Sequence, residues 1–323
     1  MPARVLVTYP LPPEARTLLR GFRVTTYRGP QPMPRDALAA GLRSADGALT
    51  LLTDRIDAAV LAGAPRLRVV ANCAVGFDNV DLAAAAARGI VVTNTPDVLT
   101  EACADLAFAL LLATARRVAE GDRLIRARGW RGWNPALLLG TEVHGATLGL
   151  VGLGRIGAAV ARRARGFGMR VLYHQRRAAA RPPAGAGRVP LRRLLATADF
   201  VSLHVPLTPA TRHLIGAREL ALMKPGAILV NTSRGAVVDE PALVRALATG
   251  RLGGAGLDVF AHEPRVPAAL RRLPNVVLTP HVASATSATR RRMAVLAARN
   301  LAAVLAGRRP PTPVTLTPTR ARD

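Results

Sequence analysis

Hydrophobic residues gather into short continuous runs along this chain, and longer segments with helical spacing separate the runs. Continuous runs, unlike alternating ones, are typical of parallel strands that helices cover on both faces. Strands that alternate with helices predict βαβ units in doubly wound sheets. The predicted strands are RVLVTY (4–9), GALTLL (47–52), RVVANC (68–73), IVVTN (90–94), TLGLVG (147–152), RVLYH (170–174), FVSLHV (200–205), AILVNT (227–232), AGLDVF (255–260) and NVVLTP (275–280).

These strands are too many for one ordinary sheet of this kind, so two domains are predicted. A long helix is expected to begin after Pro96 and to carry the chain across, with Leu106, Leu110 and Leu111 at helical spacing. A second long helix over 284–307 carries it back. We therefore predict an α/β protein with two Rossmann-like, doubly wound parallel-sheet domains, 1–98 with 285–323 and 99–284. The Pro- and Thr-rich tail from Arg308 is expected to fray.

Three glycines stand at the spacing G-x-G-x-x-G in the stretch LVGLGRIG. They follow a predicted strand and precede a helix and another strand, which is the context of a dinucleotide-binding turn. Gly152 would permit the tight turn, Gly154 would let the backbone approach a pyrophosphate, and Gly157 would let the helix pack on the strand. The helix N-terminus would offer N–H groups to the phosphates. A purely structural glycine turn is the alternative.

The end of the next strand, VLYHQRR, indicates which dinucleotide is bound. NAD-binding proteins place an Asp or Glu here for the ribose 2′-hydroxyl, whereas this chain has Gln175 followed by Arg176 and Arg177. No acidic residue occurs between Gly157 and Asp199. Guanidinium groups would bind a 2′-phosphate, so NADP(H) is favoured over NAD(H). The alternative is that these arginines are solvated charges in an arginine-rich chain.

Three polar residues follow the ends of predicted strands, where open α/β sheets place their ligands. They are Arg234 in NTSRGAVVDE, Glu263 in DVFAHEP and His281 in TPHVASAT. Reduction of a 2-oxo acid leaves negative charge on the carbonyl oxygen, and His281 could supply the proton that this oxygen needs. Glu263 would stabilise the imidazolium, and Arg234 would bind the substrate carboxylate. Each residue alone could be ordinary, so the prediction depends on their joint placement.

The chain also resembles the D-isomer-specific 2-hydroxyacid dehydrogenase family over nearly everything from Val5 to Gly307. VLYHQRR is most similar to the NADPH-preferring glyoxylate and hydroxypyruvate reductases of that family. The blocks that carry the resemblance are NCAVGFDNVD (72–81), TEACADLAFALLLATAR (100–116), GLVGLGRIG (149–157), PLTPATRHLIG (206–216), MKPGAILVNTSRGAVVDE (223–240), GLDVFAHEP (256–264) and LTPHVASAT (278–286).

The resemblance implies a flavodoxin-like substrate (catalytic) domain, 1–98 with 285–323, and an NAD(P)-binding domain, 99–284. It implies that Arg234 binds the substrate carboxylate, that His281 is the acid/base and that Glu263 is its partner. Asp258 would contact the nicotinamide carboxamide, and Thr232 and Ala283 would line the cofactor cleft. The other residues expected to bind the cofactor are Thr100, Leu153, Arg155, Ile156, Val205, Pro206, Thr211 and Ser233, beside Arg234 and His281 themselves.

On the substrate side, the resemblance implies that the backbone N–H groups of Val75 and Gly76 cradle the carboxylate. A glycine turn after a strand is also a physically reasonable anion nest. Leu51 is expected beside them in the substrate pocket. The segment RGWRGWNPALLLG (128–140) is similar to a loop that these dehydrogenases use in dimer contacts, so a homodimer is expected. Plain packing of Trp130 and Trp133 is the alternative.

Composition argues against several other classes of protein, although the charge alone leaves a nucleic-acid binder as an alternative. The formal net charge is +25, but the arginines are scattered and aromatics make up only 3% of the chain, which argues against a nucleic-acid stacking surface. Two cysteines form neither a disulfide framework nor a metal site, so no metal is expected. The most apolar helical run, LAFALLLATA, is far shorter than the ~20 residues that span a bilayer. A cytoplasmic protein without membrane contact is therefore expected.

Taken together, the sequence predicts an NADPH-preferring oxidoreductase that reduces glyoxylate or hydroxypyruvate to glycolate or D-glycerate. An NAD-dependent D-2-hydroxyacid dehydrogenase for another acid, such as D-lactate or 3-phosphoglycerate, is the alternative enzyme. A nucleotide-sensing protein of the corepressor kind is the alternative without catalysis, and an intact catalytic trio argues against it.

Overall fold

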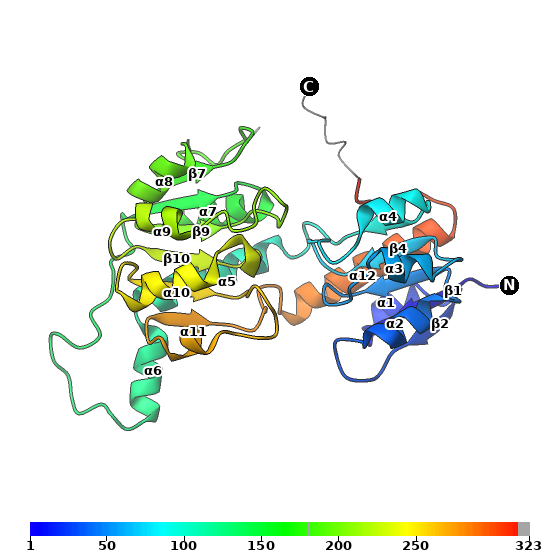
Figure 1. Ribbon diagram of the computed structural model, residues 1–323, viewed down its shortest axis with the longest axis horizontal. Coiled ribbons are helices and arrows are strands. Elements are labelled where there is room, and N and C mark those ends of the chain that lie inside the picture. The colour runs from blue at the N-terminus through cyan, green and yellow to red at the C-terminus, as the bar shows by residue number, and fades with distance from the viewer. Residues whose placement is uncertain (180, 316–323) are drawn as a thin grey trace. The chain divides into compact units, whose positions relative to one another are not determined.

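The computed structural model describes residues 1–179 and 181–315 (Figure 1). The chain divides into two compact units, one formed by Met1–Leu99 with the segment from Ala285 onward and the other by Thr100–Ser284. The boundaries predicted from the sequence follow residues 98 and 284. Each unit has its own parallel sheet and its own hydrophobic core, so each is described by itself.

The first unit is built on a five-stranded parallel sheet in the order β2-β1-β3-β4-β5. This order is that of flavodoxin-like doubly wound folds. Helix α12 packs against β3 and β4, while residues of α2, α3 and α4 join a separate core cluster with the strands. The strands are β1 (Arg4–Val7), β2 (Arg23–Thr26), β3 (Gly47–Thr50), β4 (Val69–Asn72) and β5 (Val91–Thr93), and the helices are α1 (Pro13–Thr17), α2 (Arg35–Leu42), α3 (Ala58–Ala62), α4 (Leu82–Ala87) and α12 (Ser287–Leu305).

The second unit has a seven-stranded parallel sheet in the order β12-β11-β10-β9-β6-β7-β8. Residues of α5 and α7 form one buried core cluster with the sheet, and residues of α8, α9 and α10 form another. The strands are β6 (Thr147–Val151), β7 (Arg170–His174), β8 (Gly187–Arg188), β9 (Phe200–Leu203), β10 (Ile228–Asn231), β11 (Gly254–Leu257) and β12 (Val276–Leu278). The helices are α5 (Thr100–Ala115), α6 (Val118–Arg126), α7 (Arg155–Gly166), α8 (Leu191–Thr197), α9 (Ala217–Leu222), α10 (Glu240–Ala248) and α11 (Ala268–Arg272), with a 3-10 turn at Gly235–Val237.

The strand order of the second unit reverses between β6 and β9. From β6 the chain proceeds through β7 to β8 at one side, and it then returns to add β9 at the other side of β6. Ligands of doubly wound folds bind in the crevice at the carboxyl ends of the strands that flank such a reversal. The glycine turn follows β6 and the segment from His204 follows β9, so both lie at this point. The prediction of two doubly wound parallel sheets is confirmed.

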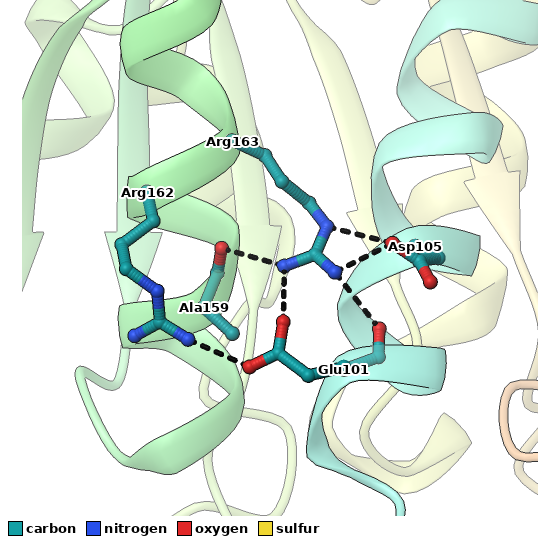
Figure 2. Close-up of polar contacts among 5 residues, drawn as sticks. All are labelled: Glu101, Asp105, Ala159, Arg162 and Arg163. Atoms are coloured by element: carbon teal, nitrogen blue, oxygen red, sulfur yellow. Dashed lines mark hydrogen bonds and ion pairs between the residues drawn. The ribbon is translucent and has the colours of Figure 1, made fainter. Parts of the chain in front are cut away.

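An ion-pair network fastens α7, the helix that follows the glycine turn, to α5 (Figure 2). The Arg163 guanidinium donates to the Asp105 carboxylate at 2.5 Å and to Glu101 at 2.8 Å, and Arg162 reaches the other Glu101 oxygen at 2.7 Å. Isolated surface ion pairs contribute little, but two arginines and two carboxylates in one network hold their helices in register. The network also neutralises part of the arginine excess on α7.

The prediction of one continuous helix after Pro96 is wrong, because the structure has two helices there. Helix α5 ends at Ala115, Arg117 takes a left-handed backbone conformation with φ 53°, and α6 begins at Val118. The Ala115 carbonyl accepts from the Thr141 N–H at 2.8 Å, so a returning segment takes up a bond that a continuous helix would use. Helix α6 contains no buried residue, which fits its separation from the packed α5.

Two strands were missed, and the tail prediction was partly wrong. Strand β2 is exposed along most of its length and β8 has only two residues, so neither carries an apolar run. The returning helix begins later than predicted, at Ser287, because Thr286 caps its first turn by accepting from the Thr289 N–H. Residues 308–315 do not fray, since the Val314 N–H donates to the Val92 carbonyl at 2.8 Å. The rest of the predicted frayed tail lies outside the described residues.

No helix within the described residues is both long enough and apolar enough to cross a membrane.

Candidate active site

At two of the three glycines in the turn after β6, a side chain would overlap neighbouring backbone atoms. Gly152 has φ 97°, and a Cβ there would lie 2.8 Å from the His204 carbonyl oxygen. A Cβ on Gly157 would lie 2.3 Å from the Gly152 oxygen, so the first turn of α7 packs directly on the glycine turn. Gly154 differs, because a Cβ there would meet nothing within 4 Å. The backbone is therefore open at Gly154, where a phosphate would approach.

The surroundings of this turn fit a dinucleotide. Helix α7 begins at Arg155 and Ile156 with Gly154 as its N-cap, and Gly154 has no side chain to accept the first N–H groups. The Thr232 hydroxyl, just after β10, is buried and has no hydrogen-bond partner among the described residues. An orphaned hydroxyl and a helix start without a side-chain cap are both features that a bound nucleotide would satisfy.

The end of β7 is tied to the glycine turn. The Leu153 N–H donates to the Gln175 side-chain oxygen at 3.0 Å, so the residue that replaces the usual carboxylate supports the turn itself. Arg176 and Arg177 follow it and are exposed. Arg188 on β8 donates to the Arg176 carbonyl at 2.8 Å and to the Gln175 carbonyl at 3.2 Å. Arg188 was not predicted from the sequence, because β8 has no apolar run that would have placed it beside β7.

The loop after β9 holds its own shape through one hydroxyl. Thr211 Oγ1 donates to the Pro206 carbonyl at 2.6 Å and accepts from the Thr208 N–H at 2.8 Å. The loop begins with Val205 and Pro206, which follow the carboxyl end of β9 next to β6. Thr211 therefore acts as a loop-forming residue in this structure, and its predicted contact with the cofactor stays a prediction.

His281 and Glu263 form a direct pair, with 2.8 Å between His281 Nδ1 and Glu263 Oε2. The other Glu263 oxygen accepts from the Phe260 N–H at 3.0 Å. Partial burial raises the pKa of Glu263, but the His281 bond and charge, the Phe260 N–H and the Arg234 charge together outweigh it and hold this pKa below its ordinary value. Glu263 is therefore ionised at neutral pH, when it accepts a proton-bearing Nδ1.

The turn that carries His281 is held by Asp258, which has no exposed surface. Its carboxylate accepts from the Thr279 hydroxyl at 2.6 Å, from the Val282 N–H at 2.8 Å and from the Ala283 N–H at 2.9 Å. Its carbonyl accepts from the N–H of His281, which has φ 53°. Both Asp258 oxygens are thus used to hold a left-handed turn, and the predicted contact with the nicotinamide carboxamide stays a prediction.

Asn231, the last residue of β10, shapes the loop that carries Arg234. Its side-chain N–H donates to the Arg234 carbonyl at 2.9 Å, and its side-chain oxygen accepts from the Ser233 N–H at 3.0 Å and from the Ser233 hydroxyl at 2.8 Å. Arg234 itself donates from Nη1 to the Ser233 carbonyl at 2.8 Å. Asn231 is buried and was missed, since a polar residue at a strand end gives no separate sequence signal.

Gly235 brings the Arg234 loop against the Glu263 loop. A Cβ on Gly235 would lie 1.9 Å from the Phe260 carbonyl carbon and 2.3 Å from the Ala261 nitrogen. The two backbones therefore touch, with only hydrogen between them. Among the causes that lower the pKa of Glu263 is the charge of Arg234, the residue before Gly235. The structure thus brings Arg234, Glu263 and His281 together within the second unit.

The candidate substrate residues of the first unit lie at the carboxyl ends of β3 and β4. The Leu51 N–H donates to the Asp54 carboxylate at 2.8 Å, and the Leu51 carbonyl accepts from the Asn79 side chain at 3.1 Å. Val75 and Gly76 follow β4, and side-chain amides hold their carbonyl groups. Leu51, Val75 and Gly76 are thus brought together within this unit.

Comparisons with known proteins identify the family of this chain. The family model described as D-isomer specific 2-hydroxyacid dehydrogenase, NAD binding domain, matches residues 108–283. The glyoxylate reductase of Korarchaeum cryptofilum is 52% identical over 316 residues, which cover 96% of this chain and 95% of that protein. This chain belongs to the D-isomer specific 2-hydroxyacid dehydrogenase family, a family of oxidoreductases.

Two solved structures extend the likeness to the whole fold. A protein from Thermus thermophilus is 53% identical with a TM-score of 0.91, over 97% of this chain and 100% of that one. The NADPH-dependent glyoxylate/hydroxypyruvate reductase of Sinorhizobium meliloti, in complex with NADP and malonate, is 39% identical with a TM-score of 0.86, over 100% of both chains.

Proposed function

We propose that this chain is an NADPH-preferring reductase that converts glyoxylate or hydroxypyruvate to glycolate or D-glycerate. The observation that carries the proposal is the 2.8 Å pair of His281 and Glu263 beside a loop that presents Arg234. A general acid, its carboxylate partner and a guanidinium group are what the reduction of a 2-oxo acid requires. The names of similar proteins, glyoxylate reductase and glyoxylate/hydroxypyruvate reductase, support the choice of substrate.

Each member of the trio has a distinct task in this proposal. A bound reduced nicotinamide supplies the hydride. His281 uses Nδ1 for Glu263, so Nε2 is the atom that donates the proton to the substrate carbonyl oxygen. Ionised Glu263 fixes the histidine tautomer and stabilises the imidazolium before the proton is given. Arg234 binds the substrate carboxylate, and its planar fork also orients the carbonyl beside it.

The cofactor would be held by the glycine turn and the start of α7. The backbone N–H groups of the first residues of α7, Arg155 and Ile156, would bind the pyrophosphate, and the orphaned Thr232 hydroxyl would meet another polar group of the cofactor. The contacts predicted for Thr100, Val205, Pro206, Ser233 and Ala283 belong to this proposal as well.

Initial rates with a panel of small 2-oxo acids, measured with NADPH and NADH in parallel, test the proposed function. Glyoxylate and hydroxypyruvate should give the highest kcat/KM, with NADPH ahead of NADH. If another acid is preferred with NADH, the chain is the alternative NAD-dependent dehydrogenase. If no acid accelerates NADPH or NADH oxidation, the enzymatic proposal fails and the nucleotide-sensing alternative gains support.

Arg176→Ala is expected to raise the KM for NADPH by about 10-fold and to leave the KM for NADH within about twofold. One exposed arginine–phosphate contact is worth roughly 1.4 kcal/mol, a factor of ten. Arg188 holds the Arg176 carbonyl, so Arg188→Ala should reduce the same preference by a smaller factor. Arg218→Ala, an exposed arginine on α9, is the matched control. A preference for NADPH that survives Arg176→Ala unchanged would contradict the 2′-phosphate assignment.

We also propose that the chain forms a homodimer through the segment 128–140. Trp130 is 54% exposed, Trp133 80% and Leu139 68%, and apolar side chains this exposed are typical of an interface. Light scattering on the purified protein should give about twice the 34.0 kDa of one chain. Trp133→Ser should shift the measured mass toward that of one chain.

The cytoplasmic location stays a prediction from the sequence.

A further inference from the structure

The turn that follows β4 is held by three donors, one for each of its successive carbonyl groups. The Val75 carbonyl accepts from the Asn94 side-chain amide at 2.9 Å. The Gly76 carbonyl accepts from the Asn72 side-chain amide, also at 2.9 Å. Both amides come from strand ends, Asn72 from β4 and Asn94 from the position just after β5. Side chains of two neighbouring strands thus fix two peptide groups of one turn.

The peptide group before these two is fixed as well, because the Ala74 carbonyl accepts from the Thr95 N–H at 2.8 Å. In a trans peptide the carbonyl and the N–H point in opposite directions. The N–H groups of Val75, Gly76 and Phe77 therefore point away from the donors. Within residues 1–179 and 181–315, none of these three N–H groups has a hydrogen-bond acceptor.

The orientation of the Asn72 amide is itself determined. Its oxygen accepts from the Thr50 hydroxyl at 3.4 Å and from the Asn79 side chain at 3.3 Å, and its NH₂ group donates to the Gly76 carbonyl and to the Asn79 side-chain oxygen at 3.1 Å. Asn72 is fully buried, so the amide has few other orientations. Asn79 also donates to the Leu51 carbonyl at 3.1 Å. The same amides therefore link the turn to the other candidate substrate loop.

The backbone of Asn94 is held by hydrogen bonds from Asn300 and Thr312. The Asn94 carbonyl accepts from the Thr312 hydroxyl at 2.7 Å and from the Asn300 side chain at 3.2 Å. Its N–H donates to the Thr312 carbonyl at 3.3 Å. These bonds use only the Asn94 backbone, so its side chain can be changed while they remain.

We propose that Asn72 and Asn94 are positioning residues that hold a nest of three N–H donors ready for the substrate carboxylate, with Phe77 supplying the third donor. The inference rests on the proposed function, in which the substrate is a 2-oxo acid, and on the carboxylate-binding role that the family resemblance implies for the N–H groups of Val75 and Gly76. Adjacent backbone N–H groups in a turn form an anion-binding concavity. Because two side-chain amides and the Thr95 N–H hold the opposite ends of the three peptide groups, the donors need no reorganisation when the anion arrives.

Asn94→Ala is expected to raise the KM for glyoxylate by about 5- to 10-fold, with kcat and the Kd for NADPH changed by less than about twofold. A carboxylate contact is equally strong in the ground and transition states, so its weakening raises KM alone. Asn275→Ala is the matched control, since it also removes an amide bond to a backbone carbonyl, at Leu247. A KM that stays at the wild-type value, or a loss confined to kcat, would overturn the role of Asn94.

A second measurement uses the unaltered protein and needs no turnover. Titration with oxamate, a small carboxylate that resembles a 2-oxo acid, should shift the backbone amide resonances of Val75, Gly76 and Phe77. In Asn94→Ala the same shifts should need about 5- to 10-fold more oxamate. Oxamate binding that leaves these three resonances unmoved would refute the nest, even in an active enzyme. Shifts without turnover of any 2-oxo acid would instead refute the proposed function and retain the nest.

Discussion

His281→Ala should lower kcat for glyoxylate by about 10²-fold or more, because it removes the only group that the proposed reaction uses to protonate the carbonyl oxygen. A positioned general acid contributes about 10²- to 10⁴-fold, and water replaces it poorly. The His281 side chain is 24% exposed, so alanine leaves space for water without uncovering a core. We expect the Kd for NADPH to rise only slightly, because the change removes one predicted cofactor contact and leaves the glycine turn and α7 intact.

The measurement is steady-state kinetics with saturating NADPH, together with cofactor titration by fluorescence. His144→Ala is the matched control, since His144 is exposed and lies before β6, away from the trio. Glu263→Gln should give a smaller loss than His281→Ala, because glutamine keeps an oxygen for the Nδ1–H but removes the negative charge. Near-normal kcat in His281→Ala would remove this residue from its role as proton donor.

Most of the fold could be predicted because the sheets are buried on both faces. A strand covered by helices needs a continuous apolar run, as in RVVANC or AILVNT, and such runs are visible in the sequence. Strand β2 lacks that signal because most of it is exposed, and β8 is too short to show one. The break in the helix at Arg117 was not predicted, because it depends on a hydrogen bond from the Thr141 N–H to the Ala115 carbonyl, and Thr141 is distant in the sequence.

In the candidate site, too, residues with a local sequence signal could be predicted, and residues whose role depends on a distant contact could not. Arg234, Glu263 and His281 could be predicted because each follows a strand end, and parallel strands bring these ends to one edge. Asn72, Asn94 and Asn231 could not, since an asparagine at a strand end gains its role only from the carbonyl that it meets.

Gly235→Ala should lower kcat/KM by about 10²-fold or more, although Gly235 has no side chain to contribute to the chemistry. A Cβ at this position would lie 1.9 Å from the Phe260 carbonyl carbon and 2.3 Å from the Phe260 oxygen and from the Ala261 nitrogen. These are backbone atoms, so a rotamer change cannot relieve the overlap. Overpacking of a buried contact typically costs about 1–3 kcal/mol and moves the backbone.

The backbone movement caused by Gly235→Ala should lower kcat/KM more than it lowers the stability of the fold. The Phe260 N–H holds one Glu263 oxygen, and the other oxygen holds His281. Separating the Arg234 loop from Phe260 therefore displaces the guanidinium from the Glu263–His281 pair, and misplacement by about 1 Å can cost about 10²-fold. Thermal melting and cofactor titration should show a folded variant that still binds NADPH. Gly166→Ala is the matched control, because a Cβ there would meet nothing within 4 Å. If Gly235→Ala kept wild-type kcat/KM, contact between these two loops would not be what aligns the trio.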